Sequence, residues 1–102
     1  MLSENETVTD TCELRPVIGL TRGLSAADLE TLTVDAIRTH RQLVGKADQL
    51  FQALPDDYKT GIAVGGGQHL VYIEAMIAMH AQMIALNTLL DILGYTPKVP
   101  VN

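Results

Sequence analysis

The residues in this chain best able to bind a metal ion are its three histidines, His40, His69 and His80. His69 and His80 are eleven positions apart, which separates them by about 16 Å along a helix axis and prevents them from sharing one ion. His40 and His80 could meet if their helices pair, but a zinc site needs three or four ligands. Since no cysteine or carboxylate is placed to complete such a set, we predict no metal and no cofactor. Both histidines are expected at apolar seams, partly buried and hydrogen-bonded.

Nucleophilic and phosphate-binding chemistry also lack essential partners in the sequence. Cys12 is the only cysteine, so it cannot form a disulfide within the chain, and no histidine lies near it to act as a base. Gly61 and Gly66 have the spacing of a phosphate-binding loop, but Gly67 and Gln68 stand where a lysine and a serine or threonine are required. We therefore predict neither catalysis nor a small-molecule substrate, and interpret the glycine cluster as a flexible hinge.

A long amphipathic helix is predicted over residues 25–54. Ser25 is followed three positions later by Asp28, the pattern of a capping box at a helix start, and Pro55 blocks continuation of the helix. Apolar side chains in between recur in steps of three, four and seven and form one broad face. That face comprises Leu29, Ala36, Ile37, His40, Leu43, Val44, Ala47, Leu50, Phe51 and Leu54. Most charges lie elsewhere on the helix, so it has one side to bury.

A second helix, predicted over residues 68–93, is apolar on more than one side. One stripe consists of Tyr72, Met76, Met79, Met83, Leu86, Leu90 and Leu93, and a second stripe of Leu70, Ile73, Ile77, His80 and Ile84. Gly94 favours an end at residue 93. Because residues 55–67 form a short connection, the two helices should pack as an antiparallel hairpin. In that hairpin Tyr72 lies at about the level of residue 50.

The expected fold is all-α, with one helical domain over residues 13–102. Residues 1–12 are polar and are predicted to be disordered. Residues 13–24 should form a short helix or ordered arm, and residues 94–102 a tail.

Self-association is predicted from the excess of apolar residues. A chain of 102 residues that is 47% hydrophobic has too little volume to bury all of them alone, and one side of the second helix lacks a partner within the hairpin. We therefore expect a homodimeric helical bundle. The candidate dimer interface is the first stripe: Tyr72, Met76, Met79, Met83, Leu86 and Leu90.

Charge and hydropathy argue against nucleic acid and membrane as direct partners. The net charge is −5 and the seven basic residues form no cluster, whereas nucleic-acid affinity relies on basic residues that contact phosphates. The most apolar stretch, residues 70–93, contains Glu74, His80, Gln82, Asn87 and Asp91, which makes it too polar for a lipid span. The acidic N-terminus lacks the apolar core of a signal peptide. A soluble cytoplasmic protein is expected.

Several long segments of the chain resemble the TraM family, the antiactivators of plasmid conjugal transfer in soil bacteria. The segments are ELRPVIGLTRGL (13–24), DAIRTHRQLVGKADQLFQALP (35–55), YKTG (58–61), QHLVYIEAMIAMHAQMIALNTL (68–89) and ILGYTPKV (92–99). They cover both helices, part of the connection and the tail, while the extreme N-terminus and VGGG (64–67) match least well. The resemblance implies two long antiparallel helices, a homodimer and a protein partner, the LuxR-type quorum-sensing activator TraR. It also implies that binding blocks DNA binding by TraR and so represses conjugal transfer genes.

The partner surface is expected among large side chains without an assigned core role. The candidates are Arg22, Leu54, Tyr58, Tyr72, Pro97 and Val99. Leu54, Tyr58 and Tyr72 should gather at the loop end of the hairpin, and Tyr and Arg are enriched in binding hot spots. Tyr72 also belongs to the candidate dimer interface. The alternative function is a structural helical dimer or assembly adaptor without a regulatory partner. The features that distinguish the two functions are Arg15, Arg22 and the tail, all of which lie outside the hairpin core.

Overall fold

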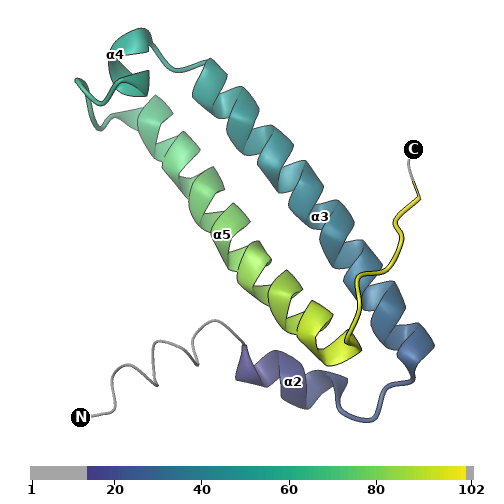
Figure 1. Ribbon diagram of the computed structural model, residues 1–102. Helices are drawn as coiled ribbons and strands as arrows, with labels where there is room; N and C mark the ends of the chain where they lie inside the picture. The colour runs from purple at the N-terminus through teal and green to yellow at the C-terminus, as the bar shows by residue number, and fades with distance from the viewer. Residues whose placement is uncertain (1–13, 101–102) are drawn as a thin grey trace, which may run out of the picture.

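The computed structural model describes residues 14–100, which form helices joined by turns, with no strand among them (Figure 1). The helices are α2 (Arg15–Thr21), α3 (Ala26–Gln52), α4 (Asp56–Lys59) and α5 (Gly67–Leu93). The predicted all-α fold with two long antiparallel helices is confirmed. The prediction for residues 1–12, including Cys12, and the last two tail residues lie outside the described part of the chain.

The two ends of α3 follow from local chemistry. At its start the Ser25 hydroxyl oxygen accepts a hydrogen bond of 3.1 Å from the Asp28 N–H, which satisfies one of the amides left over in the first turn of a helix. This confirms Ser25 as the cap. The helix ends at Gln52, two residues before the predicted end, and the Leu54 N–H donates instead to the Phe51 carbonyl in a tight turn. Pro55 then leads the chain away from α3.

The connection over residues 55–67 contains a short helix that was not predicted. α4 begins after Pro55, carries both aspartates in its first turn and ends with Lys59. Acidic residues at the start of a helix and a basic residue at its end suit the helix dipole. Beyond it, Gly65 and Gly66 have φ values of +89° and +88°, a left-handed conformation that glycine adopts without steric cost.

The pairing of α3 with α5 has the predicted antiparallel register. At the loop end Gln68 donates from Nε2 to the Ala53 carbonyl at 2.8 Å. One turn further, the rings of Phe51 and Tyr72 lie 5.6 Å apart, which confirms that Tyr72 lies near the level of residue 50. Towards the opposite end Gln82 Nε2 donates to the Ala36 carbonyl at 3.2 Å. Here the core is formed by Ala36, Leu86 and Leu89, with Val17, Ile37 and Leu90 packed against it.

Helix α2 crosses the C-terminal end of α5, at the end of the hairpin opposite α4 (Figure 1). Its attachment is a hydrogen bond of 3.0 Å from the Leu14 N–H to the Thr88 hydroxyl oxygen. Thr88 is fully buried and its own hydroxyl donates to the Ile84 carbonyl at 2.9 Å. With Val17 packed on the core, the short helix is tied to the hairpin by one buried polar contact and one apolar contact.

The tail turns back over α3 after Gly94, which caps α5 in the left-handed conformation with φ +89°. The Tyr95 hydroxyl donates to Glu30 Oε2 at 3.1 Å, and this hydrogen bond raises the pKa of Tyr95 above its usual value, helped by partial desolvation and by the negative charge of Glu30. Pro97 is buried. The tail is therefore held against the outer side of α3.

Thr88→Val should lower the free energy of unfolding by about 1 kcal/mol, because the Leu14 amide loses its acceptor. Thr33→Val is the matched control: Thr33 is equally buried, but its hydroxyl only donates to the Leu29 carbonyl of the same helix. Urea unfolding at fixed protein concentration gives the stability, and amide hydrogen exchange reports on α2. Exchange in α2 should accelerate only in Thr88→Val; an equal acceleration in both variants would contradict the assigned anchor.

Candidate functional site: protein-interaction surfaces

Residues 14–100 contain no group of three or more His, Cys, Asp or Glu side chains that could hold a metal ion. The histidines differ from the expectation for them. His40 is half-buried as expected, but its Nδ1 is buried without a hydrogen-bond partner. His80 is exposed rather than partly buried.

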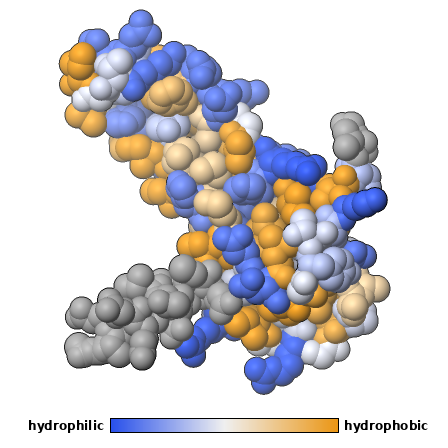
Figure 2. All heavy atoms as spheres, in the orientation of Figure 1, coloured by the Kyte–Doolittle hydropathy of each residue, from blue (hydrophilic) through white to orange (hydrophobic). Residues whose placement is uncertain are grey.

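A shallow apolar groove runs along α5. It has a volume of about 540 Å³ and is lined by Tyr72, Ile73, Met76, Ile77, His80, Ala81 and Ile84. The side chain of Ile77 is 63% exposed and that of the neighbouring Leu70 55%. Figure 2 shows apolar atoms along the outer edge of α5, on the side away from α3. We call this surface the α5 groove.

The two stripes of the second helix differ in how far the hairpin covers them. Leu86, a candidate of the first stripe, is buried in the core of the single chain and Leu90 packs against it. Met79 and Met83 are half-buried. A hairpin needs only one stripe of α5, and the stripe left uncovered is the second one, joined by Tyr72 and Met76 from the first.

The length and composition of α5 would also allow it to cross a membrane, a test that the core helices of soluble proteins pass too. Its residues include Glu74 and Asp91, and Gln82 is bonded to α3. The pairing with α3 and the groove together account for the apolar character of the helix.

Aromatic side chains gather at the loop end of the hairpin, as expected for Tyr58 and Tyr72. The link between them is His69, whose ring lies 5.4 Å from Tyr58 in an edge arrangement and 6.5 Å from Tyr72 in a stacked one. Leu54 is only 4% exposed, which corrects its assignment as a contact residue: it closes the end of the hairpin from inside.

Two exposed residues at the same end were missed. Ile62 is 76% exposed and Val64 77%, and both lie in the connection between α4 and α5. The signal in the sequence was the presence of two large apolar residues among glycines, where a loop cannot bury them. We call Tyr58, Ile62, Val64 and Tyr72 the loop-end surface.

The other contact candidates lie elsewhere. Arg22 stands between α2 and α3, at the end of the hairpin opposite α4 (Figure 1). Pro97 is buried and Val99 half-buried. The six residues predicted for one partner surface therefore divide among the loop end, the α2 turn and the tail.

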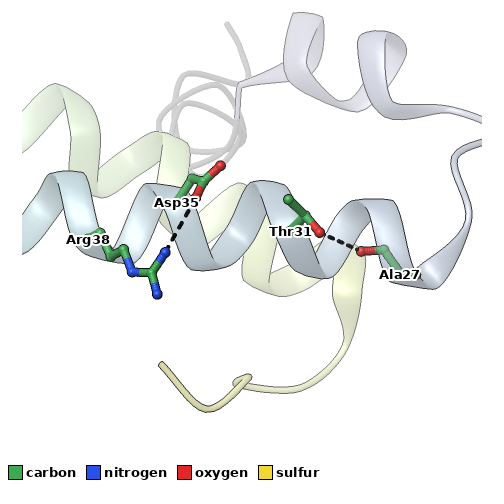
Figure 3. A network of polar contacts seen from close by, with 4 residues as sticks. All are labelled: Ala27, Thr31, Asp35 and Arg38. Carbon is green, nitrogen blue, oxygen red and sulfur yellow. Dashed lines mark hydrogen bonds and ion pairs between the residues drawn. The ribbon is translucent and has the colours of Figure 1, made fainter. Parts of the chain in front are cut away.

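A cleft of about 630 Å³ separates the tail from α3. Its lining comprises Glu30, Thr31, Val34, Asp35, Arg38, Tyr95, Thr96, Pro97, Lys98 and Pro100. Figure 3 shows the α3 side of this region, where Arg38 Nη1 lies 3.9 Å from Asp35 Oδ1 and the Thr31 hydroxyl donates to the Ala27 carbonyl. With acidic and basic side chains in equal number, the cleft has no charge preference that would select a ligand.

Comparison with known proteins identifies close relatives over the whole chain. The model of the family described as "Prokaryotic Transcriptional repressor TraM" matches residues 1–98. A protein named "Transcriptional repressor TraM" from Rhizobium radiobacter is 70% identical over 99 residues, 97% of each chain. A protein of the same name from Agrobacterium fabrum strain C58 is 66% identical over 102 residues and the full length of both. The crystal structure of "a second quorum sensing antiactivator TraM2 from A. tumefaciens strain A6" superposes with a TM-score of 0.85 at 74% identity, covering 86% of this chain and 99% of that one.

Leu54→Ala should destabilise the fold by about 2–4 kcal/mol, because it leaves a cavity at the closed end of the hairpin. Ile62→Ala removes a branched side chain that is mostly exposed at the same end and should change stability by less than about 0.5 kcal/mol. Urea unfolding measures both. If Leu54→Ala lowers the free energy of unfolding no more than Ile62→Ala does, Leu54 is not needed for packing and again becomes a candidate contact residue.

Proposed function

Because this chain belongs to the TraM family of transcriptional repressors, we propose that it is an antiactivator that binds the LuxR-type quorum-sensing activator TraR. Binding prevents TraR from engaging DNA and thereby represses the genes of plasmid conjugal transfer. The observation that carries this proposal is the similarity, over nearly the whole chain, to proteins named as TraM repressors and to a solved quorum-sensing antiactivator. The site of action is the cytoplasm, where TraR meets DNA.

The physical properties of the chain support action on the activator rather than on DNA. With a net charge of −5 the protein would be repelled by phosphates, so it cannot occupy the operator in place of TraR. It can hold TraR in an arrangement that does not fit two operator half-sites, whose spacing leaves little tolerance. The equilibrium between the two arrangements of TraR can shift only as far as the difference between the protein's affinities for them allows.

We further propose that the protein is a homodimer and that the α5 groove is the interface. Only five hydrophobic side chains are buried among the described residues, and two of them are alanines. The hairpin is flat, with a smallest extent of 18 Å, so two helices alone cannot enclose a core. A second copy laid with its own groove on Ile73, Ile77 and Ile84 would make a self-complementary contact of the kind found in twofold dimers.

Ile77→Asp should convert the dimer to a monomer, because each copy would place a carboxylate in the centre of an apolar contact. The residue is 63% exposed in the single chain, so the hairpin itself should keep its helical content. Val71→Asp, on the flank of the same helix outside the groove, is the control and should remain dimeric. Sedimentation equilibrium with circular dichroism tests both, and a dimer that persists in Ile77→Asp would place the interface on another face.

The loop-end surface is proposed as part of the contact with TraR. It combines two tyrosines with Ile62 and Val64, large side chains that the hairpin does not need for its own packing, and α4 places Asp56, Asp57 and Lys59 beside them. Tyrosines are enriched among the side chains that dominate binding energy at interfaces, and exposed aliphatic groups contribute when a partner removes them from water. Tyr58, Ile62 and Val64 lie outside the α5 groove, whereas Tyr72 lines it, so a dimer built on the groove leaves the first three accessible.

Tyr58→Ala and Tyr72→Ala should each weaken TraR binding by about 2 kcal/mol, which is about thirty-fold in Kd. Leu32→Ala, an exposed leucine of α3 away from this end, is the control and should bind normally. Titration calorimetry with TraR gives the affinities, and dimer mass and circular dichroism must be unchanged, since Tyr72 also lines the groove.

Arg22→Ala tests the opposite end of the hairpin in the same assay. If it weakens binding while both tyrosine variants bind normally, the contact lies at the α2 turn. If all three bind normally, the tail around Pro97 and Val99 becomes the next candidate.

A native chain that does not bind TraR at all would support the alternative function, a structural helical dimer or assembly adaptor. The burial of Pro97 and the packing of Val17 on the core show that α2 and the tail also serve the fold itself, so their presence alone does not decide between the two functions.

A further inference from the structure

The loop that carries Ile62 and Val64 is fastened at both ends. On the α4 side the N–H groups of Ile62 and Ala63 donate to the Asp57 carbonyl at 2.8 and 3.0 Å. On the α5 side the Gly65 N–H donates to Nδ1 of His69 at 2.8 Å. Within the described chain, His69 is the only side chain that hydrogen-bonds the backbone of residues 62–66.

The hydrogen bond from Gly65 to His69 depends on the protonation state of the imidazole. To accept a hydrogen bond at Nδ1, His69 must be neutral with its proton on Nε2. In the protonated ring both nitrogens are donors. The Gly65 N–H would then face another N–H, so the contact is lost rather than weakened.

The surroundings of His69 provide no substitute for that contact. The titratable groups in ring contact with it are Tyr58 of α4 and Tyr72 of α5. α4 also carries Asp56, Asp57 and Lys59, but His69 forms no ion pair with a carboxylate in the described part of the chain. The stacked ring of Tyr72 offers no acceptor for the Gly65 N–H in place of Nδ1.

The backbone beside the Gly65–His69 hydrogen bond has a conformation that favours glycine. Gly65 and Gly66 both have strongly positive φ values. A Cβ on Gly66 would meet the Tyr58 hydroxyl at 3.7 Å, so the loop passes close to the same aromatic group that surrounds His69. When the Gly65 bond opens, these glycines have other conformations available at little cost, and the loop is free to leave α5.

We propose that His69 is a proton-dependent latch: the neutral imidazole accepts the hydrogen bond that holds residues 64–66 against the start of α5, and protonation of the ring releases them. The closed loop is therefore lost as the pH falls. Its release changes the position of Val64 and with it the loop-end surface, while Ile62 and Ala63 stay bonded to α4. The inference concerns the free protein and holds whether or not TraR is its partner.

The test follows the protection of the Gly65 amide against hydrogen exchange, corrected for the intrinsic pH dependence of exchange. In the native chain, protection should fall about three- to tenfold between about pH 7.5 and 5, the equivalent of one net hydrogen bond. The amides of Ile62 and Ala63, which bond to α4, serve as internal references and should change little. Constant Gly65 protection across this range overturns the proposal, as does an equal fall at all three amides.

Two substitutions separate the hydrogen bond from the ring packing. His69→Phe keeps an aromatic ring between Tyr58 and Tyr72 but removes the acceptor, so Gly65 should be unprotected at both pH values. In His69→Asn the side-chain oxygen cannot titrate in this range, so the pH dependence of Gly65 protection should disappear. Retained protection in the first variant, or retained pH dependence in the second, overturns the proposal. His80→Asn, an exposed histidine of the same helix, is the control and should leave the pH dependence intact; its loss there would also overturn the proposal.

Discussion

The structure depends on one constraint: two helices packed side by side can cover only one apolar stripe of each other. α3 has a single apolar face and is satisfied by the pairing. α5 has two, and the pairing hides Leu86 and Leu89 while leaving Ile77 exposed and Ile73 and Ile84 half-buried. The remaining elements are arranged around this imbalance. α2 covers the C-terminal end of α5, the tail lies on α3, and the middle of α5 is left open.

The features that could be predicted from the sequence are those determined by neighbouring residues. The cap at Ser25 and the stop at Gly94 depend on side chains within one helical turn. The register that places Tyr72 beside Phe51 follows from the length of the connection. These interactions are local, so the sequence pattern contains nearly all the information they need.

The features that could not be predicted depend on three-dimensional placement. Both stripes of α5 have helical spacing, and only the docking of α3 decides which is buried. Leu54 ends an apolar face and looks free, yet the turn at Pro55 folds it inward. The bond from Gly65 to His69 joins residues four apart, but it requires a backbone conformation that no pattern of residue types specifies. The candidate surfaces were therefore predicted less well than the helices that carry them.

The contacts that hold the hairpin also imply an order of assembly. The bond between Gln68 and Ala53 joins residues only 15 apart, that between Gln82 and Ala36 joins residues 46 apart, and that between Leu14 and Thr88 joins residues 74 apart. Contacts between residues close in sequence cost less loop entropy and form faster. The contacts between α3 and α5 are thus expected to form first at the α4 end and then along the hairpin, with α2 docking last. During synthesis α3 emerges from the ribosome well before α5, so its apolar face stays in water until its partner helix follows.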